Sequence, residues 1–288
     1  MPIEAEQIRA YVEYFRDLGV YDFYRCGNSI VLPASELPVD ASEPGNSGPG
    51  VGAAAKVRLP YIVAGPTPIS LAMEAPIGKL TSFDELAPYP EVRVALRDRA
   101  QALLAIQEEI GDCTRCPLAY AGRRTIVFGD GDSAARVMFV GEGPGADEDA
   151  SGVPFIGKAG QLLNNMITAM GLTREQVYIA NVVKCRPPKN RVPEPVEANT
   201  CSQFLLRQMD VIQPIVVVAL GSTAATCLLG VKQPLSALRG RWHSVRRAKL
   251  VVTYHPAFLL RDPRQKGEAW KDLQMVMTEL GLKPPSKG

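Results

Sequence analysis

Four short apolar runs alternate with helical segments between residues 135 and 282, and this alternation limits the fold more than any other feature. The runs ARVMFV, VYIANVV, PIVVVAL and KLVVTY have the length and β-branched content of buried strands. Residues 159–172, 197–213, 222–229 and 268–282 are predicted as helices. Strands that alternate with helices form a parallel sheet covered on both faces. We therefore predict an α/β fold of three layers, α/β/α, around a central parallel sheet of four strands.

An unusual motif follows each of the four predicted strands. These motifs are GEGPG at 141–145, NVVKC at 181–185, LGST at 220–223 and YHPA at 254–257. The carboxyl ends of parallel strands lie at one edge of a sheet, and ligands bind beyond that edge. The sequence therefore predicts that all four motifs face the same side of the molecule.

The chain divides into three parts by composition. Residues 1–27 contain apolar side chains at helical spacing, which predicts an amphipathic N-terminal helix. That helix is either a weakly attached appendage or a segment that binds another protein. Residues 28–91 are rich in Pro, Gly and Ala, which is typical of a linker that is partly disordered. Residues 92–288 carry the regular pattern and form the predicted main domain, which opens with a helix over 92–113.

Composition favours a cytoplasmic protein, and we expect it to be a monomer. The sequence has no apolar run long enough to span a membrane, and its N-terminus has no apolar core of the secretory kind. The net charge is only +2, but basic residues outnumber acidic ones after residue 95. This excess permits a phosphate-bearing partner, although an ordinary charged surface explains it equally well.

Four cysteines have the spacing of a metal site. CTRC places Cys113 and Cys116 two residues apart, and Cys185 and Cys201 follow far downstream. Four thiolates suit a zinc ion or a [4Fe–4S] cluster, and reduced thiols are expected in the cytoplasm. Zinc ribbons usually pair two close CxxC motifs, so one CxxC with two isolated cysteines favours the iron–sulfur cluster. The alternative for CxxC alone is a pair of buried thiols. Cys227, in an apolar helix, is predicted to be a core residue.

The motifs together resemble one family. GEGPGADED, GVPFIGKAG, NVVKCRPPKNRVPEP and HPAFLLR, with the cysteines, are similar to the family 4 uracil-DNA glycosylases, the thermostable iron–sulfur type. The resemblance covers about residues 100–282. It implies an enzyme of base excision repair that hydrolyses the N-glycosidic bond of uracil in DNA and leaves an abasic site. Because a base inside a duplex cannot be reached, the enzyme must flip it out.

The resemblance assigns three side chains to the flipped base. Phe155 stacks on the uracil ring. Asn181 reads the Watson–Crick edge, because an amide donates and accepts hydrogen bonds at once. His255 donates to uracil O2, where negative charge develops as the bond breaks. The other histidine, His243, has no comparable setting.

The glycine-rich motif is expected to lie against the nucleotide. Gly143 and Gly145 let the backbone approach it and offer N–H groups, and Pro144 between them is also expected to contact the nucleotide. Related glycosylases with a GQDPY motif have an Asp where this sequence has Gly143, so that base is missing here. Glu142 is our candidate to orient water, or to exclude thymine by blocking the space beside C5. The neighbouring acids are expected to be solvated loop residues or, less favoured, water-positioning groups, and they are Asp147, Glu148 and Asp149.

Three further segments are predicted to contact DNA. Basic residues between the two late cysteines would face phosphates once metal binding folds that loop. Leucines after HPAF would wedge into the base stack as the uracil leaves. Ser222 and Thr223, after VVVALG, are candidates for holding phosphate. The basic residues are Arg186, Lys189 and Arg191, and the leucines are Leu259 and Leu260. Arg261, next to the leucines, is predicted to lie near the DNA backbone.

Three other functions fit the sequence less well. A variant that crosslinks to uracil-DNA carries a histidine in the basic loop, whereas this loop reads KNRVPEP. A non-catalytic iron–sulfur module, for nucleic-acid binding or electron transfer, would not need Phe155, Asn181 and His255 together. A phosphate-binding α/β hydrolase lacks support because the sequence contains neither GK[ST] nor GxSxG.

Overall fold

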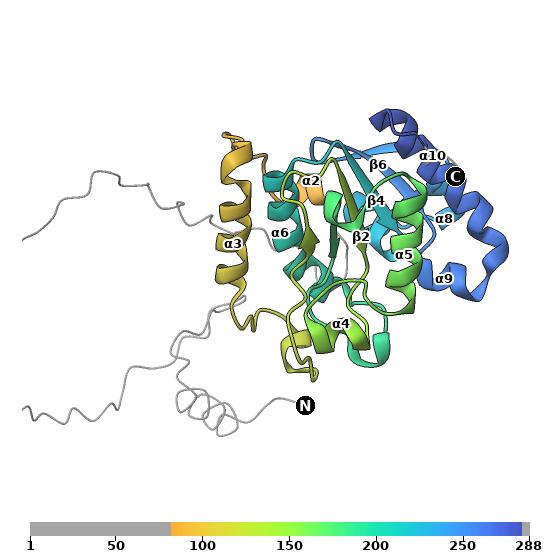
Figure 1. The fold of residues 1–288 in the computed structure, drawn as a ribbon. Coiled ribbons are helices and arrows are strands. Elements are labelled where there is room, and N and C mark those ends of the chain that lie inside the picture. Colours follow the sequence, from red (N-terminus) through yellow and green to blue (C-terminus); the bar gives the residue numbers. More distant parts are fainter. Residues whose placement is uncertain (1–81, 284–288) are drawn as a thin grey trace, which may run out of the picture. The chain divides into compact units, whose positions relative to one another are not determined.

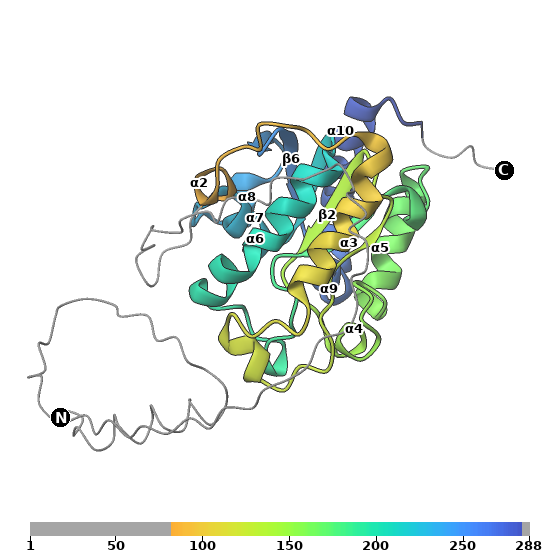
Figure 2. The same ribbon diagram turned by 90° about the vertical axis from the view of Figure 1, so that its left-hand side faces the viewer.

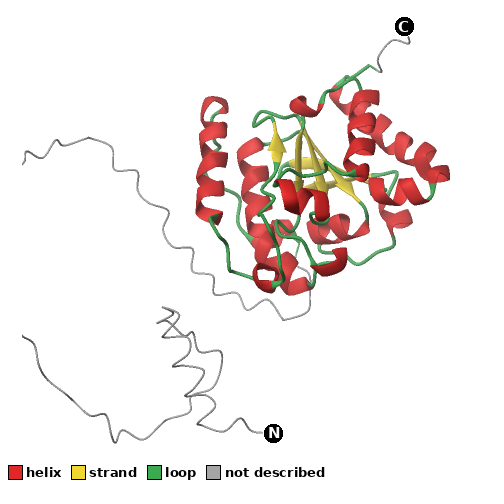
Figure 3. Cartoon of the chain, turned by 60° about the horizontal axis from the view of Figure 1, so that its bottom comes forward, coloured by secondary structure: helices red, strands yellow, loops and turns green. Residues whose placement is uncertain are grey.

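The computed structural model describes residues 82–283, and these build one sheet between two layers of helices (Figures 1 and 3). The four predicted runs form the parallel strands β2 (Val137–Gly141), β3 (Tyr178–Asn181), β4 (Val216–Leu220) and β6 (Ala248–Thr253). Their order in the sheet is β3-β2-β4-β6. The predicted three-layer α/β fold is confirmed. The predicted N-terminal helix and most of the linker lie outside the described residues.

The prediction of four strands was wrong, because the sheet has six. Strand β1 (Asp130–Gly131) pairs antiparallel with β3, and β5 (Trp242–Val245) pairs antiparallel with β6. Both are edge strands, and one is only two residues long. Neither contains an apolar run, since an edge strand is only partly covered. Hydrophobic pattern alone could not reveal them.

The helices divide between the two faces of the sheet (Figure 2). On one face, α3 (Arg99–Ile110), α6 (Pro195–Ile212) and α7 (Ser222–Leu229) share a core with Met138 and Val140 of β2. On the other face, α5 (Lys158–Ala169) and α10 (Lys266–Leu280) share a core with Val137 and Phe139 of β2. Both faces of β2 are therefore buried, which explains its continuous apolar run.

Short helical turns complete the described part of the chain. One of them, α4, occupies the acidic stretch that was predicted as a loop, and α9 follows His255. The α-helical turns are α2 (Phe83–Leu86), α4 (Ala146–Ser151), α8 (Leu235–Leu238) and α9 (Pro256–Arg261). The 3-10 turns are η1 (Leu96–Asp98), η2 (Pro117–Tyr120), η3 (Arg174–Gln176), η4 (Pro188–Asn190) and η5 (Pro263–Gln265).

The end of the segment assigned to the linker belongs to the folded domain. Phe83 is completely buried in the core that α3, α6 and α7 cover. Gly230, at the end of α7, leaves room for Ser82, because a Cβ there would lie 2.6 Å from the Ser82 backbone nitrogen. Residues 82–91 therefore do not belong to the linker. Among the described residues, no helix is long and apolar enough to cross a membrane.

Candidate active site

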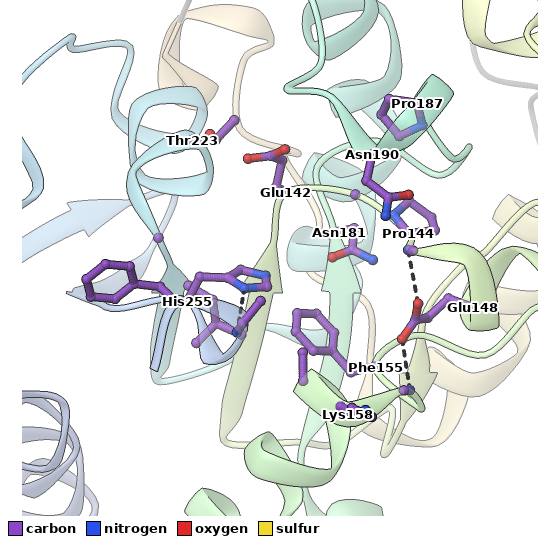
Figure 4. A pocket seen from close by; sticks show the side chains of 18 of the residues that line it. Glu142, Pro144, Glu148, Phe155, Lys158, Asn181, Pro187, Asn190, Thr223 and His255 are labelled. Carbon is purple, nitrogen blue, oxygen red and sulfur yellow. Dashed lines mark hydrogen bonds between the residues drawn. The ribbon is translucent and has the colours of Figure 1, made fainter. Parts of the chain in front are cut away.

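A cavity of about 690 Å³ opens at the carboxyl ends of the four parallel strands (Figure 4). Each strand end contributes lining residues, among them Glu142 after β2, Asn181 at the end of β3, Gly221 after β4 and His255 after β6. The four sequence motifs therefore meet at one site, as the parallel topology requires.

Asn181 is buried in this site without a partner. Its side chain is 1% exposed, and neither the amide oxygen nor the amide nitrogen has a hydrogen-bond partner among the described residues. Leaving a buried polar atom unsatisfied costs about 1–3 kcal/mol. A carboxamide kept in this state at the wall of a cavity indicates a ligand that supplies a donor and an acceptor.

Gly141 keeps the floor of the cavity open. It pairs with Asn181 across β2 and β3, and a Cβ at this position would lie 2.3 Å from Asn181 Oδ1. The same Cβ would lie 2.6 Å from Cζ of Phe155. Any side chain at position 141 would therefore displace the amide or the aromatic ring, so the glycine is required for space.

Phe155 lies on the floor beside Asn181 (Figure 4). Its side chain is 5% exposed, and its ring centroid is 5.6 Å from that of His255, with the rings tilted by 33°. Its backbone has a φ of 52°, in the left-handed region. For a residue other than glycine this conformation costs about 1–2 kcal/mol. The loop around Phe155 must therefore be held by other contacts.

His255 is neutral and presents one N–H group to the cavity. Its Nδ1 accepts a hydrogen bond of 3.1 Å from the backbone N–H of Ala257, at the start of α9. Burial, aided by the positive charge of Arg261 and opposed by Glu148, lowers the pKa of His255 to about 4. At neutral pH the single proton is therefore on Nε2, because Nδ1 is the acceptor.

Glu142 is a half-buried carboxylate on the wall of the cavity opposite Phe155 (Figure 4). Burial raises its pKa above the ordinary value, while a hydrogen bond from the Thr223 hydroxyl has the smaller, opposite effect. Cys227 of α7 lies behind it, and burial together with the charge of Glu142 raises the pKa of that thiol to about 12. Cys227 is 4% exposed and belongs to the core, as the sequence predicted.

Two acids that were expected to be solvated bind backbone N–H groups instead. The carboxylate of Glu148 accepts hydrogen bonds of 3.0–3.1 Å from Gly145, Ile156 and Gly157, and so ties the GEGPG loop to the loop after Phe155. The carboxylate of Asp149 is 2% exposed and accepts from the backbone of residues 124 and 125. Asp147 alone is exposed, and it lines the cavity.

The glycines of the GEGPG motif serve close packing. A Cβ on Gly143 would lie 2.8 Å from Cγ2 of Val183, and one on Gly145 would lie 2.6 Å from Oε2 of Glu148. The N–H of Gly145 already donates to Glu148, so it is not available to a base or a phosphate. That part of the prediction was wrong, although Gly143, Pro144 and Gly145 all line the cavity.

The predicted DNA-contacting residues differ in their availability. Leu260 is 44% exposed, whereas Leu259 is 1% exposed, so the prediction that Leu259 wedges into the base stack was wrong. Successive residues of a helix point in different directions, and α9 turns Leu259 inward. Arg261 and Ser222 are exposed and line the cavity.

The positive charge of the basic loop between Cys185 and Cys201 is partly neutralised. Arg191 donates to both carboxylate oxygens of Glu197, at 2.7 and 2.8 Å, and Glu197 is fully buried. The charge of Arg191 is therefore partly compensated within the chain. Arg191 still lines the cavity with its side chain 38% exposed, so its contact with phosphate stays a prediction. Arg186 donates to Oδ1 of Asn190 at 2.8 Å, and Lys189 is exposed. Lys189 is the most accessible cation of the three.

Sequence reasoning gave no role to several cavity residues, although each lies inside one of the quoted motifs. Lys158 follows the PFIG segment, and Tyr254 and Phe258 flank His255 with their rings stacked at 5.1 Å. The position of these residues within the motifs was the available signal. The residues in question are Lys158, Asn190, Tyr254 and Phe258.

The four predicted cysteine ligands meet at a second, small cavity. Cys113, Cys116, Cys185 and Cys201 line it, and all are free thiols. Burial is the main cause that raises the pKa of Cys185 and Cys201, and the neighbouring thiols contribute to both. Within residues 82–283, no group of three or more His, Cys, Asp or Glu side chains is arranged to hold a single metal ion.

Two hydrogen bonds point at these sulfurs. Arg123 donates to Cys185 Sγ at 3.3 Å, and the backbone N–H of Lys184 donates to Cys201 Sγ at 3.2 Å. Arg123 also donates to the carbonyl of Cys113 at 2.6 Å. Donors of this kind stabilise thiolates, so the donor set fits a group that binds thiolate sulfur. Sequence reasoning did not identify Arg123.

Comparison with known proteins decides the family. The family model described as the Uracil DNA glycosylase superfamily matches residues 128–274, which contain the strands and motifs of the large cavity. The chain belongs to the uracil-DNA glycosylase superfamily. The match also covers the Cys185–Cys201 segment but not the CxxC motif.

Relatives within the superfamily include several of type 4. The chain is 44% identical over 168 residues to a type-4 uracil-DNA glycosylase of Thermotoga maritima, covering 57% of this chain and 86% of that protein. It is 39% identical over 194 residues to one of Archaeoglobus fulgidus, covering 65% and 97%. The chain is also 31% identical to a type-5 uracil-DNA glycosylase of Pyrobaculum aerophilum, over 51% of this chain and 78% of that protein.

Proposed function

We propose that this chain excises uracil from DNA by hydrolysing the N-glycosidic bond, as a uracil-DNA glycosylase of type 4. The observation that carries the proposal is the buried carboxamide of Asn181, which has no partner among the described residues and lies beside the Phe155 ring and the neutral His255 imidazole. These three groups match the edge, the face and the O2 atom of a flipped uracil.

Base recognition follows from the chemistry of Asn181 and Phe155. Uracil presents an acceptor at O4 next to a donor at N3–H, and one carboxamide satisfies both. Cytosine presents the reverse order, so the same amide orientation would place donor against donor. Phe155 supplies a stacking surface, which contributes about 1–3 kcal/mol for a base.

Bond cleavage requires help for the leaving group. As the glycosidic bond breaks, negative charge gathers on uracil, and the Nε2–H of His255 can donate to O2. A neutral imidazole suits this role because its N–H stabilises the developing negative charge by a hydrogen bond, and the proton does not have to be transferred to uracil. The hydrogen bond to Nδ1 fixes the tautomer that carries this N–H.

Glu142 is the group that we assign to the attacking water. Its carboxylate is half-buried on the wall opposite Phe155, and the Thr223 hydroxyl faces it (Figure 4). A carboxylate whose pKa is raised by burial is a stronger base than an exposed one, so it can orient water toward the sugar carbon and accept its proton.

The proposed activity is tested with a labelled oligonucleotide that contains one uracil. We expect the purified chain to release uracil from single- and double-stranded forms, so that alkali then cleaves the strand at the abasic site. The matched oligonucleotide with thymine at the same position should stay intact. If the uracil strand also stays intact with the iron-loaded protein, the proposed function is wrong.

We propose further that Cys113, Cys116, Cys185 and Cys201 hold an iron–sulfur cluster. Their meeting at one cavity, the two hydrogen bonds to sulfur and the similarity to type-4 enzymes support this. Each thiolate of such a cluster binds a different iron, so the sulfurs need not surround one point. When bound, the cluster supplies covalent crosslinks that fix the loop between Cys185 and Cys201.

Substitution of single cysteines tests the cluster. We expect the purified protein to be brown and to contain iron, and Cys185→Ser or Cys201→Ser to lose both the visible absorbance and most of the iron. Cys227→Ser is the matched control, because Cys227 is equally buried but lies in the α7 core. Equal iron content in all three variants would contradict the assignment.

A further inference from the structure

The backbone of Phe155 is held in an unfavourable conformation. Its φ of 52° lies in the left-handed region, which a bulky aromatic residue rarely adopts. The same conformation turns the ring onto the cavity floor, where it lies 5.6 Å from the His255 ring. Such strain persists only when surrounding contacts fix it. The structure shows which contacts do so.

Arg174 caps the two carbonyl groups at this point of the chain. Its guanidinium donates to the carbonyl of Pro154 at 2.5 Å and to that of Phe155 at 3.2 Å. Arg174 starts the η3 turn, outside the four cavity motifs, and its side chain is 18% exposed. One rigid guanidinium therefore binds the peptide units on both sides of the Phe155 Cα.

The guanidinium is itself fixed by two other side chains. It donates to the carboxylate of Asp130 in β1 at 3.2 Å and to Oδ1 of Asn164 in α5 at 3.1 Å. These partners anchor it to the sheet edge and to a helix. On the other side of the loop, Gly160 of α5 leaves room for the Phe155 carbonyl, because a Cβ there would lie 1.8 Å from that oxygen.

We infer that Arg174 is a positioning residue for uracil recognition, which acts by holding the Phe155 ring in its stacking place. This inference rests on the proposed function. Arg174 does not line the cavity, so it reaches the base only through Phe155. Without it, the loop can relax toward negative φ, and the ring leaves the position in which it covers the base.

The inference predicts a loss that is confined to base binding. Stacking on Phe155 affects the extruded uracil, whereas phosphate contacts depend on other residues such as Lys189. Arg174→Gln should therefore weaken inhibition by free uracil by about tenfold or more, since stacking on an aromatic ring contributes that much. Binding of the same oligonucleotide with thymine in place of uracil should change less than about twofold.

Arg246 provides a matched control. Like Arg174 it caps two backbone carbonyls and pairs with an acid: it is buried, and it donates to the carbonyls of Ala87 and Pro88 and to the carboxylate of Asp210. It lies away from the cavity, so Arg246→Gln should lower the unfolding temperature without changing the uracil inhibition constant. If Arg174→Gln and Arg246→Gln give the same uracil inhibition constant as the wild type, the inference is overturned.

A double-mutant cycle tests the route through Phe155. In a Phe155→Leu background, Arg174→Gln should change uracil inhibition by less than about twofold, because the ring that it holds is gone. An effect as large as in the wild-type background would overturn the inference. If Arg174→Gln does not fold, Arg174→Lys keeps the charge beside Asp130 but cannot cap both carbonyls, and it should still weaken uracil inhibition. Full inhibition in that variant would overturn it.

Failure of this inference is distinguishable from failure of the proposed function. A wild-type protein that releases no uracil contradicts the proposed function itself. A wild-type protein that releases uracil and is inhibited by it, with Arg174 variants that behave identically, contradicts only the role of Arg174.

Discussion

His255→Ala is expected to lower the single-turnover rate of uracil excision by about 10²–10³-fold, the loss seen when one preorganised donor to a developing oxyanion is removed. The imidazole lies at the cavity with its Nδ1 fixed by the N–H of Ala257. Its Nε2–H is therefore aimed before the substrate arrives. Alanine cannot replace this donor, and a water molecule in its place would have to be oriented during the reaction.

The pH dependence separates His255 from Glu142. The pKa of His255 is lowered to about 4, so the imidazole stays neutral as pH falls from neutral through the range in which free histidine gains a proton. The pKa of Glu142 is raised, so this carboxylate gains a proton at a higher pH than usual. Activity should therefore decrease at acid pH as Glu142 gains a proton. Glu142→Gln should remove this decrease from the pH profile.

His243→Ala is the control for His255→Ala. The sequence has two histidines, and His243 lies on β5 with Nε2 2.8 Å from the carbonyl oxygen of Leu238, away from the cavity. Its replacement should leave excision unchanged. A loss below about tenfold in His255→Ala would contradict the assigned role. With only two imidazole signals, NMR titration also checks directly that His255 remains neutral well below the usual histidine pKa.

The parallel core of the sheet was predictable because its physical cause, the continuous apolar run of each strand, lies in a short stretch of sequence. A strand buried on both faces needs a continuous apolar run, and β2, β4 and β6 each have one. The convergence of Glu142, Asn181 and His255 then followed from topology, since parallel strands end at the same edge. Phe83 was not predictable, because one aromatic residue in a polar segment does not indicate which core it enters.

The finer details of the site depend on contacts between distant parts of the chain. Leu259 and Leu260 are adjacent and chemically identical, and only the orientation of α9 decides which one is buried. The ion pair between Arg191 and Glu197 was not predicted, because nothing in the loop sequence indicates which acid Arg191 meets. Arg174 lies nineteen residues after Phe155, and nothing in its local sequence indicates that it caps that loop.

Asn181→Leu is expected to reduce uracil excision by about 10²–10³-fold and yet not destabilise the protein. The substitution removes the amide and leaves N3–H and O4 of a bound uracil without partners, each unsatisfied group costing about 1–3 kcal/mol. In the free protein the amide is buried and has no hydrogen-bond partner among the described residues. Replacing such a group by an apolar side chain of similar size removes an unfavourable contribution, so the unfolding free energy should stay equal or rise.

Gln208→Leu provides the contrast. Gln208 is also fully buried, but its amide accepts from Nζ of Lys184 at 2.6 Å and donates to the carbonyl of Phe128 and the hydroxyl of Tyr178, both at 3.0 Å. Its loss removes these three hydrogen bonds between buried groups, although Lys184 keeps its bond to the carbonyl of Asn181, and should lower the unfolding free energy by about 2 kcal/mol or more. Denaturant unfolding of both variants measures the difference. If Asn181→Leu destabilises the fold as much as Gln208→Leu does, the amide of Asn181 supports the structure, and it is not held in reserve for a ligand.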